Sequence, residues 1–241
     1  MSSNVKWRGE PLPRGRHKLA AEAVRNSQRA RIVRAMLECV GRDGYKATTV
    51  PQVVATARVS RNAFYEFFAD KADCFMGVCD QTSEELLGEL VELISEPDWI
   101  TAICKGTRRY LRWWQERPTI SSAYLLSMPA VGERALRQRE RQYAGFRAMF
   151  ADLGRRARSE QPELGQLGEL IPRVLVLTIT ELVADEVRAG RTAKITSLSE
   201  EIALLAIRLL ADDATAERVR AEGLAAEDDE AEDDDEVAVA R

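Results

Sequence analysis

The sequence predicts an all-α protein, and three observations support that fold class. Apolar residues recur at helical spacing along most of the 241 residues. Residues that start and end helices flank these apolar stretches. No segment alternates apolar and polar residues as a half-buried strand does, and the sequence contains no glycine-rich phosphate loop and no internal repeat. We therefore expect a small helical domain at the N-terminus, followed by a larger one.

The first two helices are predicted from the residues at their ends. One spans residues 27–43 and is followed by Gly44, where a left-handed residue would terminate it. The next spans residues 49–57, because Thr49 and Gln52 have the spacing of a capping box and a proline falls in the first turn. A connection of only a few residues therefore joins them.

Two more helices follow at once. Ser60 can cap a third helix, which should end near Phe67. Asp70 can cap a fourth, whose apolar stripe predicts a length of about 25 residues before Pro97. The first third of the chain is thus a series of four closely connected helices.

Five more helices are predicted in the rest of the chain. Their apolar residues keep helical spacing, and prolines or glycines mark several of their ends. The last of them should start at a second capping box, Ser197 with Glu200. The five expected helices are Ile100 to about Pro118, Thr119–Met128, 132–158, 170–189 and 198–211.

Charge is distributed unevenly behind a formal net charge of −4. Residues 1–75 have 14 basic and 7 acidic groups, residues 76–210 have 18 and 19, and residues 211–241 have 3 and 13. A basic first third is typical of a surface that binds the phosphates of nucleic acid. A solvated charged face explains the same count equally well.

The composition argues against several classes of protein. No stretch reaches the roughly 18 uninterrupted apolar residues of a membrane-spanning helix, and the start of the chain lacks the apolar block of a secretory signal, so we expect a cytoplasmic protein. With His17 as the only histidine and no CxxC spacing, we expect no metal site, no catalytic cluster and no cofactor. We expect reduced, mostly buried thiols at Cys39, Cys74, Cys79 and Cys104.

The helices at 49–57 and 61–67, with three residues between them, have the proportions of a helix-turn-helix, whose second helix enters the DNA major groove. The wider run GYKATTVPQVVATARVSRNAFYEFFADKADCF, residues 44–75, closely resembles the DNA-binding domain of TetR-family transcriptional regulators. The matching residues are Gly44-Tyr45, Thr48-Thr49-Val50, Ala55, Ala57-x-Val59-Ser60, Phe64-Tyr65, Phe68 and Lys71, preceded by Ser27, Gln28, Arg29, Ile32 and Ala35. The rest of the chain is similar to the family only in its helical architecture.

The sequence departs from the family pattern in the turn and in the helices beside it. Arg58 stands where the family usually has a glycine, so it must adopt a left-handed conformation at some cost or change the turn. Val54 replaces a common small residue. Phe67 stands where the family often has a histidine or another polar residue, so a phosphate hydrogen bond is lost there.

The helix-turn-helix gives a set of candidate DNA-binding residues. Thr48 and Thr49 can present hydroxyl and backbone N–H groups to a phosphate, and Thr49 can cap its helix at the same time. Arginine and asparagine at the start of the recognition helix can read guanine and adenine, so base contacts are assigned to Ser60, Arg61 and Asn62. The resemblance implies phosphate contacts for Tyr65 and Lys71. We assign Phe64 and Phe68, four residues apart, to the core of the small domain.

Residues 1–26 form a basic arm ahead of this domain. Arg14, Arg16 and Lys18 can enter a narrow minor groove, where the negative potential attracts arginine. An arm without a function is the alternative. Replacing the three residues with alanine should lower the salt dependence of DNA binding only if the arm binds.

The larger domain is expected to bind a small effector, since the resemblance implies a cavity there. Residues 98–158 are rich in aromatic residues and methionine, although only 6% of the chain is aromatic. Core packing explains most of them, but Trp113 and Trp114 point about 100° apart on a helix and cannot face the same interior line. The effector-binding candidates are Trp99, Tyr110, Trp113, Trp114, Tyr124, Met128, Phe146 and Met149, which favour a hydrophobic or aromatic effector.

The last two helices are expected to form the interface of a homodimer. Residues 170–189 and 198–211 have more apolar surface than one helix face usually hides in a monomer. The resemblance implies a four-helix interface, and a dimer matches the two half-sites of a palindromic operator. The interface candidates are Val174, Leu175, Leu182, Leu205 and Leu209.

The expected regions are a flexible basic arm (1–26), a helix-turn-helix domain (27–75), an effector-binding and dimerisation domain (76–212) and an acidic disordered tail (213–241). The implied protein is a DNA-binding repressor, not an enzyme, that a hydrophobic or aromatic effector releases from a palindromic operator. A helical protein-binding scaffold and a regulator without an effector are the alternatives. The acidic run at 227–236 either keeps the chain soluble or competes with DNA for the basic domain. If it competes, deleting residues 227–241 should raise the affinity for DNA at low salt.

Overall fold

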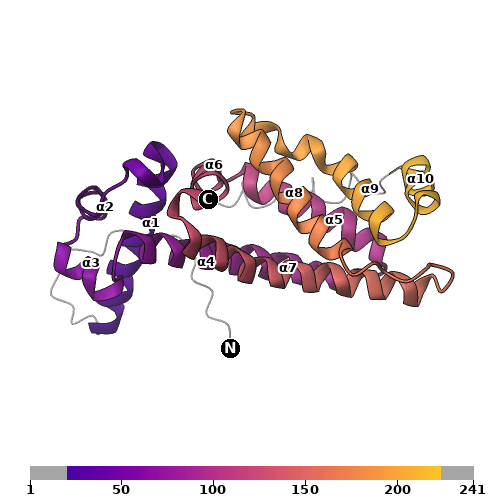
Figure 1. The fold of residues 1–241 in the computed structure, drawn as a ribbon, viewed down its shortest axis with the longest axis horizontal. Helices are drawn as coiled ribbons and strands as arrows, with labels where there is room; N and C mark the ends of the chain where they lie inside the picture. Colours follow the sequence, from indigo (N-terminus) through magenta and orange to yellow (C-terminus); the bar gives the residue numbers. More distant parts are fainter. Residues whose placement is uncertain (1–20, 224–241) are drawn as a thin grey trace, which may run out of the picture. The chain divides into compact units, whose positions relative to one another are not determined.

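A computed structural model describes residues 21–223, which form helices joined by short connections (Figure 1). The described part of the chain contains no strand, which confirms the all-α fold class. The α-helices are α1 (Ala21–Ala47), α2 (Val50–Ala57), α3 (Arg61–Phe67), α4 (Lys71–Glu92), α5 (Trp99–Gln115), α6 (Pro118–Ser121), α7 (Glu133–Glu160), α8 (Ile171–Arg188), α9 (Ser199–Leu210) and α10 (Asp213–Glu222). Three short 3₁₀ helices, η1 (Leu93–Ser95), η3 (Met128–Val131) and η4 (Thr192–Leu198), and one π-helix, η2 (Ser122–Leu126), link them.

The chain divides into two compact units. The first consists of the described residues up to Glu84 together with Arg117–Glu140, and the second of Glu85–Glu116 together with the described residues from Arg141 onward. The unit that holds the helix-turn-helix therefore also includes α6 and the start of α7. None of the described helices is long and apolar enough to cross a membrane.

The core of the first unit is built by the apolar faces of its helices. Its side chains are almost completely shielded from solvent, and burial of each stabilises the fold by about 1.5–3 kcal/mol. They come from all four N-terminal helices: Ile32, Met36, Cys39 and Val40 from α1, Val53 from α2, Phe64 from α3 and Phe75 from α4. This core holds α2 and α3 against α1.

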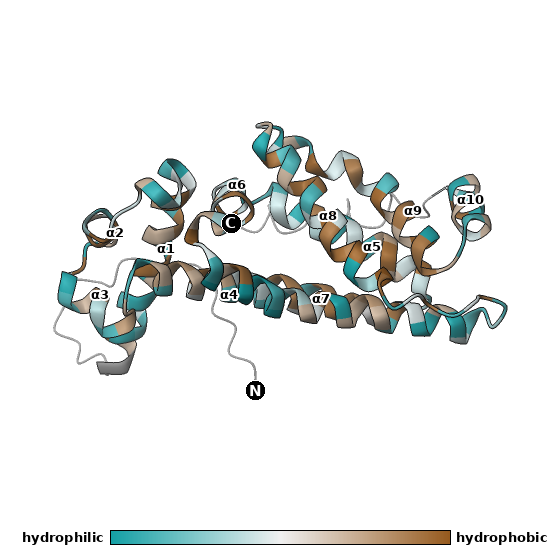
Figure 2. Ribbon diagram, viewed as in Figure 1, coloured by the Kyte–Doolittle hydropathy of each residue, from teal (hydrophilic) through white to brown (hydrophobic). Residues whose placement is uncertain are grey.

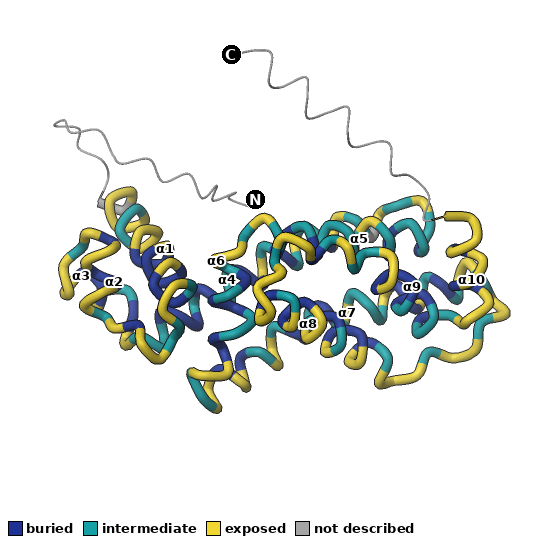
Figure 3. The backbone as a smooth tube through the Cα atoms, turned by 90° about the horizontal axis from the view of Figure 1, so that it is seen from above, coloured by how far each residue is buried: buried dark blue, intermediate teal, exposed yellow. Residues whose placement is uncertain are grey.

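The core of the second unit lies between α5, α8 and α9. Apolar residues (brown in Figure 2) run along α5 and α9, and most of α9 is buried (dark blue in Figure 3). The buried side chains include Ile103 and Leu111 from α5, Leu175 and Val183 from α8, and Ile202 and Ile207 from α9. As expected for reduced thiols in a helical core, Cys39, Cys74 and Cys79 are buried and Cys104 is half-buried, which raises the pKa of Cys104 to about 11.

Several predicted helix ends are confirmed. Gly44 has a φ of 77°, a conformation that suits glycine and breaks α1 near its end. The predicted start of this helix at residue 27 is wrong, because α1 begins at Ala21, within the segment expected to be a flexible arm. The Asp70 carboxylate accepts a 2.7 Å hydrogen bond from the Asp73 amide and so caps α4. Gly190, just beyond α8, has a φ of 72°.

The prediction of one regular helix over residues 119–128 is wrong. The segment consists of α6, η2 and the start of η3, three short stretches with different hydrogen-bond patterns. Prolines at 118 and 129 limit the segment to a few turns, and the Ser121 hydroxyl donates to the Arg117 carbonyl at 3.0 Å, in competition with the helical ladder. The chain here is helical but irregular.

Two predictions near the C-terminus are also wrong. The Ser197 hydroxyl does not cap α9 but donates to the Lys194 carbonyl at 2.7 Å, because η4 runs directly into α9 and leaves no extended N-cap residue. Part of the expected disordered tail, residues 213–222, forms α10, which Asp212 caps and whose residues Ala216 and Val219 are buried. The acidic run at 227–236 lies outside the described residues.

Candidate nucleic-acid interface

The second helix of the chain starts at the predicted capping box. The Thr49 amide donates to the Gln52 side-chain oxygen at 2.7 Å, and the Gln52 amide donates to the Thr49 hydroxyl at 3.4 Å. Val53, Val54 and Ala57 turn into the core, so one side of α2 packs while the other stays exposed. Thr49 thus acts as the cap that the sequence predicts.

The turn between α2 and α3 depends on Arg58. Its φ of 53° and ψ of 49° are left-handed, and it is the one non-glycine residue with positive φ in the described part of the chain. Arg58 thus takes the left-handed conformation itself, at a cost of about 1–2 kcal/mol for a residue with a Cβ. The Val59 amide closes it by donating to the Val54 carbonyl at 3.1 Å, and the Arg31 guanidinium donates to the Arg58 carbonyl at 3.3 Å.

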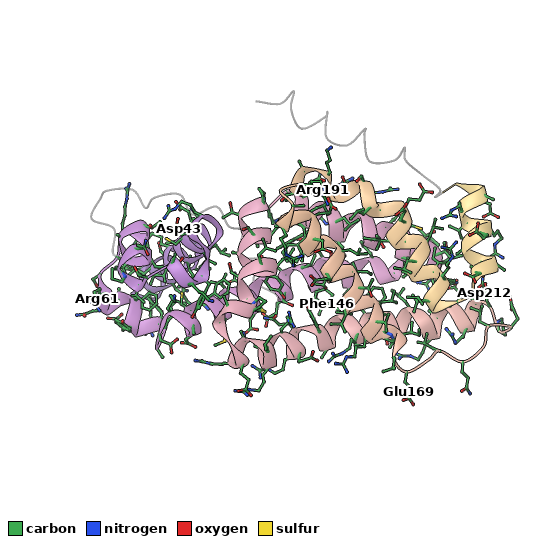
Figure 4. All side chains as sticks on the ribbon, turned by 45° about the horizontal axis from the view of Figure 1, so that its top comes forward. Asp43, Arg61, Phe146, Glu169, Arg191 and Asp212 are labelled. Atoms are coloured by element: carbon green, nitrogen blue, oxygen red, sulfur yellow. The ribbon has the colours of Figure 1, made fainter. Side chains whose placement is uncertain are left out.

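The third helix presents polar side chains to solvent. Ser60 caps it by accepting a 3.0 Å hydrogen bond from the Ala63 amide. Arg61 and Asn62 are exposed, Tyr65 is 49% exposed, and the Arg61 side chain points away from the other helices of its unit (Figure 4). The opposite face, with Phe64, packs inward, as the assignment of this residue and of Phe68 to the core predicts: their exposed fractions are 0% and 5%.

Two of the candidates, Thr48 and Lys71, make contacts inside the unit. Thr48 is 1% exposed, and its hydroxyl donates to the Gly44 carbonyl at 2.9 Å. The Lys71 ammonium donates to the carbonyls of Tyr45 and Thr48, both at 2.8 Å, and burial lowers its pKa. The roles of these two as phosphate contacts stay predictions, as do those of Arg14, Arg16 and Lys18, which lie outside the described residues.

The second unit holds most of the predicted effector-binding residues. Trp99, Trp113 and Trp114 are each at most 2% exposed, so both neighbouring tryptophans are buried. The rings of Trp113 and Trp114 meet edge to face, with centroids 4.8 Å apart, and Tyr110 packs against Trp114 at 6.1 Å. Phe146 and Met149 also belong to this unit, whereas Tyr124 and Met128 are buried residues of the first.

Tyr110 provides a polar group within this aromatic cluster. Burial raises its pKa to about 12, while side-chain hydrogen bonds with Thr180 and Trp114 lower it in part. Sequence reasoning missed Thr180, which gives no signal in the sequence because it lies 70 residues away on α8. The cluster thus combines large apolar surfaces with a few hydrogen-bonding groups.

Residues 32–78, which contain the helix-turn-helix, match the family model described as bacterial regulatory proteins, tetR family. This match makes the N-terminal helix-turn-helix a DNA-binding domain of the TetR type. No curated protein matches the sequence.

Solved structures of TetR-like fold cover most of this chain. FadR from Bacillus subtilis, determined in complex with stearoyl-CoA, is 12% identical and has a TM-score of 0.68, with 74% of this chain and 97% of that chain covered. FadR from Bacillus halodurans is 14% identical, with a TM-score of 0.66 and coverages of 73% and 96%. TylP from Streptomyces fradiae is 18% identical, with a TM-score of 0.57 and coverages of 80% and 90%. At these identities the likeness shows the fold.

Helix α8 and the residue before it expose apolar side chains. Leu170, Val174, Leu177 and Leu182 are exposed to between 38% and 67%. Leu175 is 0% exposed, so its assignment to a dimer interface is wrong: it packs within its own unit. Leu205 and Leu209 are half-buried on α9. Val174 and Leu182 are the two interface candidates with substantial exposed surface.

Proposed function

We propose that this chain is a TetR-family transcriptional repressor that binds a palindromic operator as a homodimer and dissociates when a small apolar effector binds. The exposed polar face of α3 carries the proposal. Arg61 and Asn62 extend from the first turn of a helix whose other face is anchored in the core. Arginine can bond guanine and asparagine can bond adenine in the major groove, each through two hydrogen bonds.

The same helix offers a contact that does not depend on base sequence. Tyr65 is exposed one turn after Arg61 and its hydroxyl can donate to a phosphate. Such contacts fix the register of a recognition helix without selecting a sequence. Substitutions of Arg61 and of Tyr65 should therefore separate the reading of bases from the contacts with the DNA backbone.

The DNA-binding test uses the full chain and fluorescence anisotropy. The probe is DNA flanking the chain's own gene, and a duplex selected by the chain from a random library serves if that DNA holds no site. Arg61→Ala should weaken binding by about 1–3 kcal/mol and relax selectivity for the bases it contacts. Tyr65→Phe should weaken binding to all sequences alike, and Arg173→Ala, an exposed arginine of α8, should leave selectivity unchanged.

The outcomes separate the candidate functions. Selective, salt-resistant binding with dimer stoichiometry supports the proposal. Equal binding of all duplexes, lost at moderate salt, contradicts operator recognition. An absence of DNA binding would favour the protein-binding scaffold instead.

The aromatic cluster of the second unit supports the choice of an apolar effector. Trp114 packs against Tyr110 and Trp113 packs against Trp114, and large apolar side chains with few polar groups are typical of small-molecule sites. Stearoyl-CoA, the ligand of the B. subtilis FadR structure, is a suitable first probe. Titration should quench tryptophan fluorescence and release the operator. Quenching without release would contradict its role as an inducer.

A further inference from the structure

Lys71 contacts the backbone of the residues that lead into the helix-turn-helix. Its ammonium nitrogen lies 2.8 Å from the Tyr45 carbonyl and 2.8 Å from the Thr48 carbonyl. The same nitrogen lies 4.1 Å from the centroid of the Tyr45 ring. One cation in the first turn of α4 therefore contacts the last turn of α1 and the residue before the α2 cap.

The two carbonyls lie where the helical hydrogen-bond pattern is interrupted. In a continuous helix, the Tyr45 and Thr48 carbonyls would accept from the amides of Thr49 and Gln52. Those amides instead donate to side-chain oxygens in the capping box, at 2.7 and 3.4 Å. Carbonyls at a helix end need hydrogen-bond donors from elsewhere. Lys71 is that donor, 26 residues from Tyr45 and 23 residues from Thr48 in the sequence.

The contacts use most of the bonding capacity of the ammonium group. A lysine has three N–H donors, and two of them are directed to these carbonyls, with the Tyr45 ring against the cation. Two other cationic side chains of this unit make different contacts. Arg61 is exposed, and Arg134 forms ion pairs with Asp70 and Asp73 at the start of α4. Lys71 alone among these three joins α4 to the chain entering α2.

We infer that Lys71 is a positioning residue for DNA recognition, acting through the backbone of Tyr45 and Thr48 to fix the start of α2 and, with it, the pose of α3. This inference rests on the proposed DNA-binding function. Its role is distinct from that of a phosphate contact, because a phosphate contact contributes to the salt dependence of binding. Each neutralised phosphate makes the fall of log K with log salt concentration steeper by about 0.9.

The experiment compares Lys71→Met with Lys46→Met in the full chain. Lys46 is an exposed lysine beside Tyr45, so its loss removes the same charge from the same region. Anisotropy titrations over a salt series should show a roughly tenfold loss of operator affinity for Lys71→Met at every salt concentration, with the parent's slope. A fall of log K with log salt concentration that is less steep by about 0.9 than in the parent would overturn the inference and assign Lys71 to a phosphate.

Hydrogen exchange of the free proteins tests the inference without DNA. Peptides covering residues 44–58 should exchange faster in Lys71→Met than in the parent, while Lys46→Met keeps the parent's pattern. Unchanged exchange in Lys71→Met would overturn the inference even if the variant binds weakly. A parent that shows no selective DNA binding but does show the exchange effect would contradict the proposed function and leave Lys71 as a structural clamp only.

Discussion

Gly41 lies where two helices of the first unit come into close contact. A Cβ at this position of α1 would lie 2.6 Å from the Thr119 methyl carbon and 2.8 Å from the Thr119 carbonyl oxygen. Because a backbone oxygen cannot move aside as a side chain can, we expect Gly41→Ala to destabilise the protein by about 1–3 kcal/mol in urea unfolding. Gly88→Ala is the control: a Cβ at this position of α4 would meet no atom within 4 Å, so the substitution should stabilise by about 0.5–1 kcal/mol. Equal stability of the two variants would contradict the close contact.

Tyr110 predicts a pH dependence of stability. Its pKa is raised by burial from 10.0 to about 12, so the folded state holds the phenol proton more tightly than the unfolded state. The corresponding stability is complete below about pH 10 and is lost as pH rises toward 12, by at most about 2.7 kcal/mol. Tyr110→Phe cannot ionise but loses its hydrogen bonds, at a cost of about 1 kcal/mol near pH 8.

The measurement is urea unfolding of both proteins at about pH 8 and about pH 11. The stability advantage of the parent over Tyr110→Phe should shrink at the higher pH. All other titrating groups are shared, so they cancel in this difference. An advantage that stays constant would show that the phenol ionises as easily in the folded protein as in the unfolded chain.

At the residue scale, sequence reasoning succeeds where the partners are neighbours in the chain. The capping box of Thr49 and Gln52 was predictable because both groups lie within one turn. The hydrogen bonds of Lys71 were not predictable, because the packing of α1 against α4 determines which carbonyls lie near its ammonium group. The resemblance implied a phosphate role, whereas the position of the ammonium group follows from long-range packing.

At the element scale, α10 should contribute to the stability of the second unit. It packs on α9, and Thr215, Ala216 and Val219 are buried there. Deleting residues 212–241 should lower the melting temperature by several degrees, because about 2 kcal/mol of apolar burial is lost. Deleting only residues 224–241 should leave it unchanged. Similar melting temperatures for the two truncated chains would show that α10 adds no stability.

The helix α10 shows how a compositional argument fails locally. Average charge makes residues 211–241 one acidic segment, yet the dense run of acid starts only at residue 227. Asp212 and Asp213 stand at the start of α10, where carboxylates cap and stabilise a helix. The opposite error was made at residues 119–128. The apolar pattern there predicts one regular helix, but the segment forms short, irregular helical turns bounded by prolines.

For the whole molecule, the fold and the recognition helix were predictable, whereas the burial of each candidate was not. Periodicity places an apolar residue on a helix but cannot distinguish a core face from an interface face when both are apolar. Leu175 and Val174 are adjacent in the sequence, yet one is 0% and the other 41% exposed. The dimer prediction therefore rests on the exposed side of α8.

Val174→Glu and Leu182→Glu should convert the proposed dimer to monomers. In a two-fold interface each substitution occurs twice, and burying unpaired carboxylates costs several kcal/mol. Val91→Glu is the matched control, since Val91 is 47% exposed on another helix of the same unit. Sedimentation velocity should show monomers for the two α8 variants and dimers for the parent and Val91→Glu. The monomers should also lose affinity for the palindrome, because one recognition helix reaches only one half-site. Dimers that persist in both α8 variants would place the interface on another face of the chain.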